Sequence, residues 1–284
     1  MKSALRLVTY MILVSLLGRP LHAQWVKTNG PYGGPIVNCF ATVGTKLFAG
    51  VSDDGVYLST DSGVSWKRVS SNLPSIHIYA LANDDGTLLA ATSKGLFSTV
   101  NDGASWYPAG EDQRLDTLIC YVASIDSIVF AAPYGNGIFR SSDHGNTWTH
   151  VDSVYSYAQV SSFASSGGFI LSASDGGGII RSFDNGVTWE PADSGLLNKF
   201  VSSLNVSGAY MFAATMGGIF VSTDHGGSWT ESDSGMTIKV VSSMVTVLLL
   251  TMESRGSRRI PDSYRPGPSV SGYTRLEFSA GPYL

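Results

Sequence analysis

The chain has 284 residues, of which 43% are hydrophobic and 14% charged, so it can bury one large core or two modest ones, and this composition excludes a disordered chain. Its 32 glycines and 11% aromatic residues indicate all-β structure, because glycine supplies the positive φ angles of tight turns between strands. The formal net charge of −4 argues against a nucleic-acid partner, since phosphate binding needs a basic surface.

Residues 1–23 have the pattern of a cleavable secretory signal peptide. Lys2 and Arg6 precede an apolar run over residues 7–17 that is too short to span a membrane, and Ala23 ends the segment before Gln24. We expect a secreted or periplasmic mature chain with no membrane span, and an uncleaved membrane anchor is the alternative. Cleavage leaves 15 basic residues against 22 acidic ones, a net charge of about −7.

The tryptophans reveal an internal repeat. The six tryptophans of the chain are separated by 41, 40, 42, 41 and 40 residues, and they lie at Trp25, Trp66, Trp106, Trp148, Trp189 and Trp229. The last five close one octapeptide, which reads STDSGVSW, TVNDGASW, SSDHGNTW, SFDNGVTW and STDHGGSW. A fixed period of about 41 residues is typical of repeat architectures.

The octapeptide predicts a turn between two strands. An aspartate accepts hydrogen bonds from the backbone of its own turn, a glycine two residues later takes a left-handed backbone, and the tryptophan opens the next strand with its ring buried. These positions are Asp61, Gly63, Trp66; Asn101, Gly103, Trp106; Asp143, Gly145, Trp148; Asp184, Gly186, Trp189; and Asp224, Gly226, Trp229. Asn101 keeps an acceptor oxygen and lacks the charge.

Three further strands precede each turn. The first is an apolar or small run at 36–41, 76–82, 118–123, 159–164, 200–205 and 240–245, the second lies at 47–50 and its equivalents, and the third begins with glycine at 55–59 and its equivalents. Four short strands in about 41 residues predict the blade of a β-propeller.

The octapeptide resembles the Asp-box, or BNR repeat, of sialidases, xyloglucan-cleaving hydrolases, sortilin-type receptors and the photosystem II assembly factor family. This resemblance implies a β-propeller and implies that the box is a surface turn away from the ligand site, so its aspartates are structural. It does not select one function, because these proteins use the same scaffold for unrelated tasks.

The repeat predicts a propeller over residues 24–250 with five complete boxes and, most simply, six blades. Residues 240–245 open a sixth blade, and Trp25 to Lys27 can supply its fourth strand and close the ring. Residues 251–284 show neither box nor tryptophan. This irregular tail is either a degenerate blade, a divergent cap or the product of a frame disruption.

Ligand candidates lie in the loops on the face opposite the box turns. Shorter loops contribute Asp53, Asp54, Lys94, Tyr134, Asp175 and Met216, and longer ones Glu111, Asp112, Arg114, Asp116, Tyr155, Tyr157 and Lys199. A ring of polar and aromatic groups around one channel mouth suits a sugar or a peptide. The alternative is that they are ordinary solvated loop residues.

The pattern favours a binding or scaffolding protein, a monomer, that recognises an extracytoplasmic protein or a glycan. A secreted glycosidase is the alternative, which needs two carboxylates such as Asp53 or Asp54 with Asp116 or Asp175. The spacing selects no pair, and the innermost runs lack the arginines of a sialidase clamp. No cofactor or metal is expected, because two of the histidines lie inside box turns, and Cys39 and Cys120 lie two repeats apart as expected free thiols.

Overall fold

The computed structural model describes residues 36–152 and 158–232, which form five four-stranded antiparallel sheets, here called blades 1 to 5 in chain order. Blade 1 holds β1 (Val37–Val43), β2 (Lys46–Val51), β3 (Gly55–Ser59) and β4 (Lys67–Arg68). Blade 2 holds β5 (Ile78–Asp84), β6 (Thr87–Thr92), β7 (Gly95–Thr99) and β8 (Tyr107–Pro108). The short 3-10 helix η1 (Gln113–Leu115) follows it.

Blades 3 to 5 repeat this order. Blade 3 holds β9 (Ile119–Ile125), β10 (Ile128–Pro133), β11 (Ile138–Ser141) and β12 (Thr149–Asp152). Blade 4 holds β13 (Gln159–Ser166), β14 (Phe169–Asp175), β15 (Gly178–Ser182) and β16 (Glu190–Pro191). Blade 5 holds β17 (Val201–Ser207), β18 (Tyr210–Thr215), β19 (Gly218–Ser222) and β20 (Thr230–Glu231).

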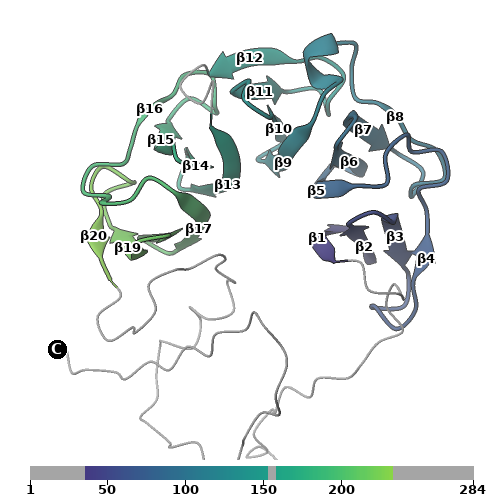
Figure 1. Cartoon of the computed structure of the whole chain (residues 1–284), viewed down its shortest axis with the longest axis horizontal. Helices are drawn as coiled ribbons and strands as arrows, with labels where there is room; N and C mark the ends of the chain where they lie inside the picture. Colours follow the sequence, from purple (N-terminus) through teal and green to yellow (C-terminus); the bar gives the residue numbers. More distant parts are fainter. Residues whose placement is uncertain (1–35, 153–157, 233–284) are drawn as a thin grey trace, which may run out of the picture.

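The blades stand in an arc around a common centre (Figure 1). Within each blade the strands pair in sequence order, so β1, β5, β9, β13 and β17 lie innermost and the short fourth strands lie at the outer rim (Figure 1). The all-β architecture and the four strands per repeat are therefore confirmed. Residues 1–35, 153–157 and 233–284 lie outside the described ranges, and with them the predicted signal peptide, the candidates Tyr155 and Tyr157, the predicted sixth blade and the tail. Within the described ranges, no helix is long and apolar enough to cross a membrane.

The core consists of apolar clusters between adjacent blades. One cluster joins blades 1 and 2 through Phe48, Leu81 and Trp106, and another joins blades 3 and 4 through Phe130 and Ile180. Similar clusters join blades 2 and 3 and blades 4 and 5. Because each interface is buried only when its neighbour is present, every blade depends on the next one for its stability.

The two cysteines are free thiols in different blades, as expected from the repeat. Cys39 lies in β1 and Cys120 in β9. Burial raises the pKa of the Cys39 thiol to about 12 and that of Cys120 to about 11. Both groups are therefore protonated at neutral pH.

The box turns have the hydrogen bonds that the sequence predicts. In the fifth blade, Asp224 Oδ1 accepts from the backbone N–H of Ser228 at 2.8 Å, and its Oδ2 accepts from the Ser228 hydroxyl at 2.6 Å. The glycine takes the left-handed backbone, with φ +77° at Gly226. The residue before it does so too, with φ 58° at His225, so two consecutive left-handed residues build the turn.

Blade 2 shows what the charge adds. Asn101 Oδ1 accepts from the Ser105 N–H at 2.9 Å and from the Thr99 hydroxyl at 2.8 Å, so the amide holds the same turn. In the charged turns a second oxygen also takes a serine or threonine hydroxyl at 2.6 Å, as Asp61 does with Ser65. The turn therefore forms without the charge, and the carboxylate adds one further, charge-assisted hydrogen bond.

We expect the stability of the protein to fall in acid because of these carboxylates. The hydroxyl and the N–H of the residue four further on lower the pKa of Asp61, Asp184 and Asp224 to about 2 from the ordinary 3.8. Since the folded pKa is depressed, the stabilisation is present above about pH 4 and is lost as the pH falls through about 2. Urea unfolding between pH 5 and 2 measures the effect. The triple variant with asparagine at these positions should lose less stability than the unaltered protein between pH 5 and 2. The assignment would be contradicted if the free energy of unfolding fell with pH equally steeply in both proteins.

Candidate functional site

The loops opposite the box turns surround a hollow at the centre of the arc. It has a volume of about 440 Å³ and is lined by Asn38, Ser52, His77, Tyr79, Cys120, Tyr121, Gln159, Val160 and Ser161. These residues come from the starts of β1, β5, β9 and β13 and from the loop after β2. Because four blades contribute, the hollow is the mouth of the central channel, and we call it the channel mouth.

One repeat position supplies four of the lining side chains. The residue that follows the first apolar residue of the innermost strand is Asn38, Tyr79, Cys120 and Ser161 in blades 1 to 4, each 41 residues after the last. The residue before it is a buried valine or isoleucine in blades 2 to 5. A position that varies in type inside an otherwise regular repeat is therefore the signal that could have identified the mouth.

Hydrogen bonds between blades fix the shape of the mouth. Asn38 Nδ2 donates to the carbonyl oxygen of Ile78 at 2.7 Å and to Ser52 Oγ at 3.1 Å. The Ser161 hydroxyl donates to the carbonyl oxygen of Val201 in blade 5 at 2.5 Å. The polar groups of the mouth are thus partly held in place before any ligand arrives.

The predicted ligand residue Asp53 contacts the lining of the mouth through its side chain. Its Oδ1 lies 2.8 Å from His77 Nδ1, and its side chain is 77% exposed. The His77 ring packs on Tyr79, with 4.6 Å between the ring centroids. His77 had no role in the sequence-based hypothesis, and its position two residues before Tyr79 places it at the rim of the mouth.

The other predicted candidates are spread over this face rather than gathered. Asp54 accepts from the Tyr57 hydroxyl at 2.6 Å, which raises the pKa of Tyr57, and its carbonyl accepts from Arg68 Nε at 2.7 Å. Asp175 forms a backbone bridge with Phe200. Lys94, Tyr134 and Asp175 do not line the channel mouth. Asp54 therefore braces blade 1, and the structure brings no pair of these carboxylates together in the mouth.

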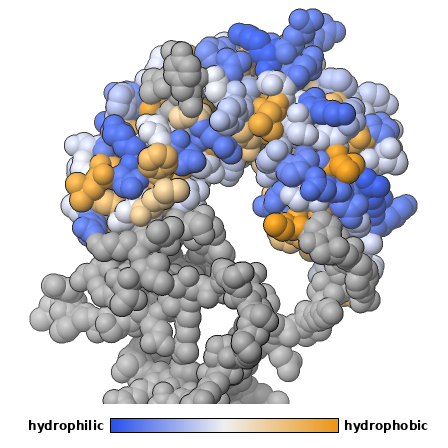
Figure 2. Space-filling view, viewed as in Figure 1, coloured by the Kyte–Doolittle hydropathy of each residue, from blue (hydrophilic) through white to orange (hydrophobic). Residues whose placement is uncertain are grey.

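Exposed apolar side chains surround the mouth on the same face. Large ones lie in its loops, among them Ile76 (46% exposed), Tyr134 (62%), Leu197 (83%), Phe200 (47%) and Met216 (55%). The surface view shows apolar patches separated by hydrophilic residues along the arc (Figure 2). A neutral polar centre with scattered apolar and aromatic side chains is typical of surfaces that bind proteins.

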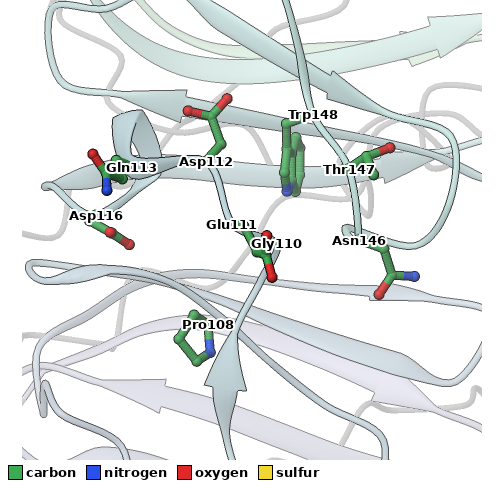
Figure 3. Close-up of a pocket in the computed structure, with 9 residues that line it drawn as sticks. All are labelled: Pro108, Gly110, Glu111, Asp112, Gln113, Asp116, Asn146, Thr147 and Trp148. Carbon is green, nitrogen blue, oxygen red and sulfur yellow. The ribbon is translucent and has the colours of Figure 1, made fainter.

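A second hollow lies farther out, between blades 2 and 3. It has a volume of about 840 Å³ and is lined by Pro108, Gly110, Glu111, Asp112, Gln113, Asp116, Asn146, Thr147 and Trp148 (Figure 3). One part of its lining belongs to the connection from β8 to β9, which contains η1, and the other part, with Trp148, belongs to the box turn of blade 3. We call it the rim hollow.

The carboxylates of the rim hollow differ in their partners. Asp112 holds Arg114 through contacts of 2.9 and 2.6 Å, and these hydrogen bonds lower the pKa of Asp112. Glu111 and Asp116 form no ion pair among the described residues. Figure 3 shows both side chains among the residues that line the hollow. This hollow is where the described structure brings predicted loop carboxylates together.

A serine, an aspartate and a histidine also meet on the box-turn side. Buried Asp84 accepts from the Ser124 hydroxyl at 2.6 Å and lies 2.6 Å from His144 Nδ1. The carboxylate stands between the serine and the histidine, so the histidine is not placed to take the serine proton. The three residues tie the end of β5 to blade 3 and do not form a hydrolase triad.

Comparisons with known proteins identify the fold. No family model matches the chain, and no curated protein matches it. Among solved structures, the GH74 enzyme of Niastella koreensis is 20% identical, with 69% of this chain and 31% of that chain covered and a TM-score of 0.53. The extracellular domain of the putative hybrid two component system BT4673 from B. thetaiotaomicron is 16% identical, with coverage of 77% and 31% and a TM-score of 0.62.

A third similar structure is YCF48 bound to D1 peptide, which is 17% identical, with 70% of this chain and 67% of that chain covered and a TM-score of 0.54. All three are β-propeller proteins. The fold is that of a β-propeller. The matched region spans about a third of the length of the first two chains. Since these structures include both glycoside hydrolases and proteins that are not enzymes, the likeness selects no function.

Proposed function

We propose that the protein is an exported Asp-box propeller that binds an extended segment of an extracytoplasmic protein at the channel mouth. The observation that carries this proposal is the convergence of four blades on a mouth lined by neutral hydrogen-bonding side chains. Amide and hydroxyl groups such as those of Asn38, Gln159 and Ser161 match the N–H and C=O groups of a peptide main chain. The structure of YCF48 bound to D1 peptide supports the choice, as it shows that a similar fold takes a peptide.

The apolar rim favours a protein over a glycan. Leu197, Phe200 and Met216 offer no hydrogen bonds, and sugars are recognised through many hydroxyl contacts, whereas methionine and aromatic side chains are enriched at protein interfaces. Among the residues that the structure describes, the lining of the mouth also carries no carboxylate, lysine or arginine. It therefore lacks both the acid pair of a glycosidase and the cationic clamp for an acidic sugar.

Selection and calorimetry test this proposal. Peptides are selected from a displayed random library on the full mature chain, and their dissociation constants are measured by isothermal titration. We expect Gln159→Ala combined with Tyr134→Ala to weaken binding by about tenfold or more, because both side chains are exposed on the ligand face. Val100→Ala is the matched control, since Val100 is 79% exposed on a box turn. Binding at the mouth would be contradicted if the double variant and the Val100→Ala control lost the same amount of affinity.

The rim hollow keeps the glycosidase alternative testable. Glu111 and Asp116 are the carboxylates that such an enzyme would use there. We expect no release of sugar from sialosides or xyloglucan by the purified protein. Release that is abolished by Glu111→Gln or Asp116→Asn, and retained in Asp53→Asn, would replace the binding proposal with a hydrolase acting at the rim hollow.

A further inference from the structure

The face of blade 1 that points away from blade 2 is apolar and uncovered among the described residues. Phe40 in β1 is 64% exposed, but its equivalents Leu81, Val122 and Leu204 are at most 8% exposed, and the equivalent Phe163 of blade 4 is partly buried against blade 3. Val37 is 37% exposed, and its equivalents in the other blades are at most 2% exposed. The side chains in blades 2 to 5 are buried because the preceding blade packs against them. Blade 1 therefore has the surface of a blade whose predecessor is missing from the described ranges.

The opposite end of the arc shows the complementary pattern. Phe212 in β18 is partly exposed, whereas the equivalent Phe48, Leu89, Phe130 and Leu171 in the preceding blades are all 0% exposed. In those blades this position faces the following blade. The two ends of the arc thus present the two halves of an interface that recurs four times inside it.

The tryptophans show which atoms should meet at the uncovered face. Three of the five box tryptophans donate their indole N–H to a carbonyl of the preceding blade, three residues after that blade's own tryptophan. Trp106 donates to Val69 at 2.8 Å, Trp148 to Ala109 at 2.9 Å and Trp229 to Ala192 at 2.7 Å. Trp189 donates to Gly186, and the strand before it, β12, carries a register shift. Trp66 donates to Gly63 at 3.1 Å within its own turn.

The sequence before blade 1 contains the matching segment. Trp25 precedes Val37 by 12 residues, and the same 12 residues separate Trp66 from Ile78, Trp148 from Val160 and Trp189 from Val201. Residues 25–36 therefore have the length of an outermost strand with its connection to the next innermost strand. Thr28 takes the place of Val69, and residues 240–245 (VVSSMV) repeat the innermost-strand pattern of residues 200–205 (FVSSLN).

We infer that residues 25–28 form the outermost strand of a sixth blade that covers Phe40 and Val37, with the Thr28 carbonyl accepting the Trp66 indole N–H. Residues 240–251 supply the inner strands of that blade and cover Phe212. The occupant of the open face is thus the chain's own two terminal segments. This inference is independent of what binds at the channel mouth.

Hydrogen exchange of the tryptophan indoles tests the inference on the full mature chain. With ¹⁵N-labelled tryptophan, the Trp66 indole should exchange within about threefold of the rate of Trp106, because both have an acceptor in the preceding blade. Replacing residues 25–28 (WVKT) by GSGS should accelerate Trp66 exchange by about tenfold or more and leave Trp229 unchanged. Replacing residues 30–33 (GPYG) by GSGS is the matched control, which should leave Trp66 protected.

Three results would overturn the inference. They are Trp66 exchange at the solvent rate in the unaltered chain, protection that survives the 25–28 replacement, and protection that rises with protein concentration, as a second copy on the open face would cause. If the replaced chain fails to fold, the unaltered chain decides. A nuclear Overhauser contact between the Trp66 indole proton and the Thr28 backbone then supports the inference, and its absence overturns it.

Discussion

Replacing Trp106 with alanine should lower the free energy of unfolding by about 3–5 kcal/mol. The Trp106 ring is 3% exposed and packs in the cluster between blades 1 and 2 with Phe48 and Leu73. Its indole N–H donates to the Val69 carbonyl at 2.8 Å. The substitution thus opens a cavity between two blades and leaves the carbonyl without its donor, and both effects destabilise.

Equilibrium unfolding in urea measures this loss, with Tyr107→Ala as the control. Tyr107 is the next residue along the chain and is 64% exposed, so its truncation should change the free energy of unfolding by less than about 0.5 kcal/mol. A loss below about 1 kcal/mol for Trp106→Ala would mean that its ring is not part of the interface between the blades. Trp148 is half-buried, so Trp148→Ala should lower the free energy of unfolding by an amount between those of Tyr107→Ala and Trp106→Ala.

Gly186→Ala should lower the free energy of unfolding by about 2–4 kcal/mol. Gly186 has φ +77°, which alone penalises a side chain by about 1 kcal/mol. An added Cβ would lie 2.3 Å from Cε1 and 2.5 Å from Cζ of Phe130. Phe130 is fully buried and stacks on Phe163 at 5.3 Å, so its ring has no free space into which to move. The overlap therefore adds about 1–3 kcal/mol of packing strain.

Gly86→Ala separates the two contributions. Gly86 has φ +88°, close to that of Gly186, but an added Cβ there would meet nothing within 4 Å. Its substitution should cost about 1 kcal/mol, the backbone penalty alone. Equal thermal and urea stabilities of the two variants would show that the box glycine of blade 4 does not contact Phe130 and would contradict the packing between blades 3 and 4.

The elements that repeat could be predicted from the sequence, because a period of 41 residues averages out the errors of any single copy. The box aspartates, the left-handed glycines and the four strands of each blade lie where the octapeptide and the apolar runs place them. The second left-handed residue of each turn was not predicted, because serine, aspartate, histidine and asparagine share that position without a common signature.

The candidate site could be predicted only in its location. The face opposite the box turns follows from strand order, but the lining of the mouth depends on how far each loop reaches toward the channel. Charged loop residues such as Asp54 point to neighbours within their own blade, and the mouth is lined by neutral residues such as Asn38 and Gln159. The rim hollow is lined by the one described connection that contains a 3-10 helix, so no position shared by the repeats could reveal it.

Exchange mapping of a bound peptide tests the central claim most directly. Backbone amide exchange is compared in the free protein and in its complex with a selected peptide, blade by blade. We expect added protection at the starts of the innermost strands, over residues 37–39, 77–79, 119–121 and 159–161, and none at the box turns of residues 59–66 and 222–229. Protection confined to the box turns or to residues 108–116 of the rim hollow would contradict the account, because the ligand would then bind away from the channel mouth.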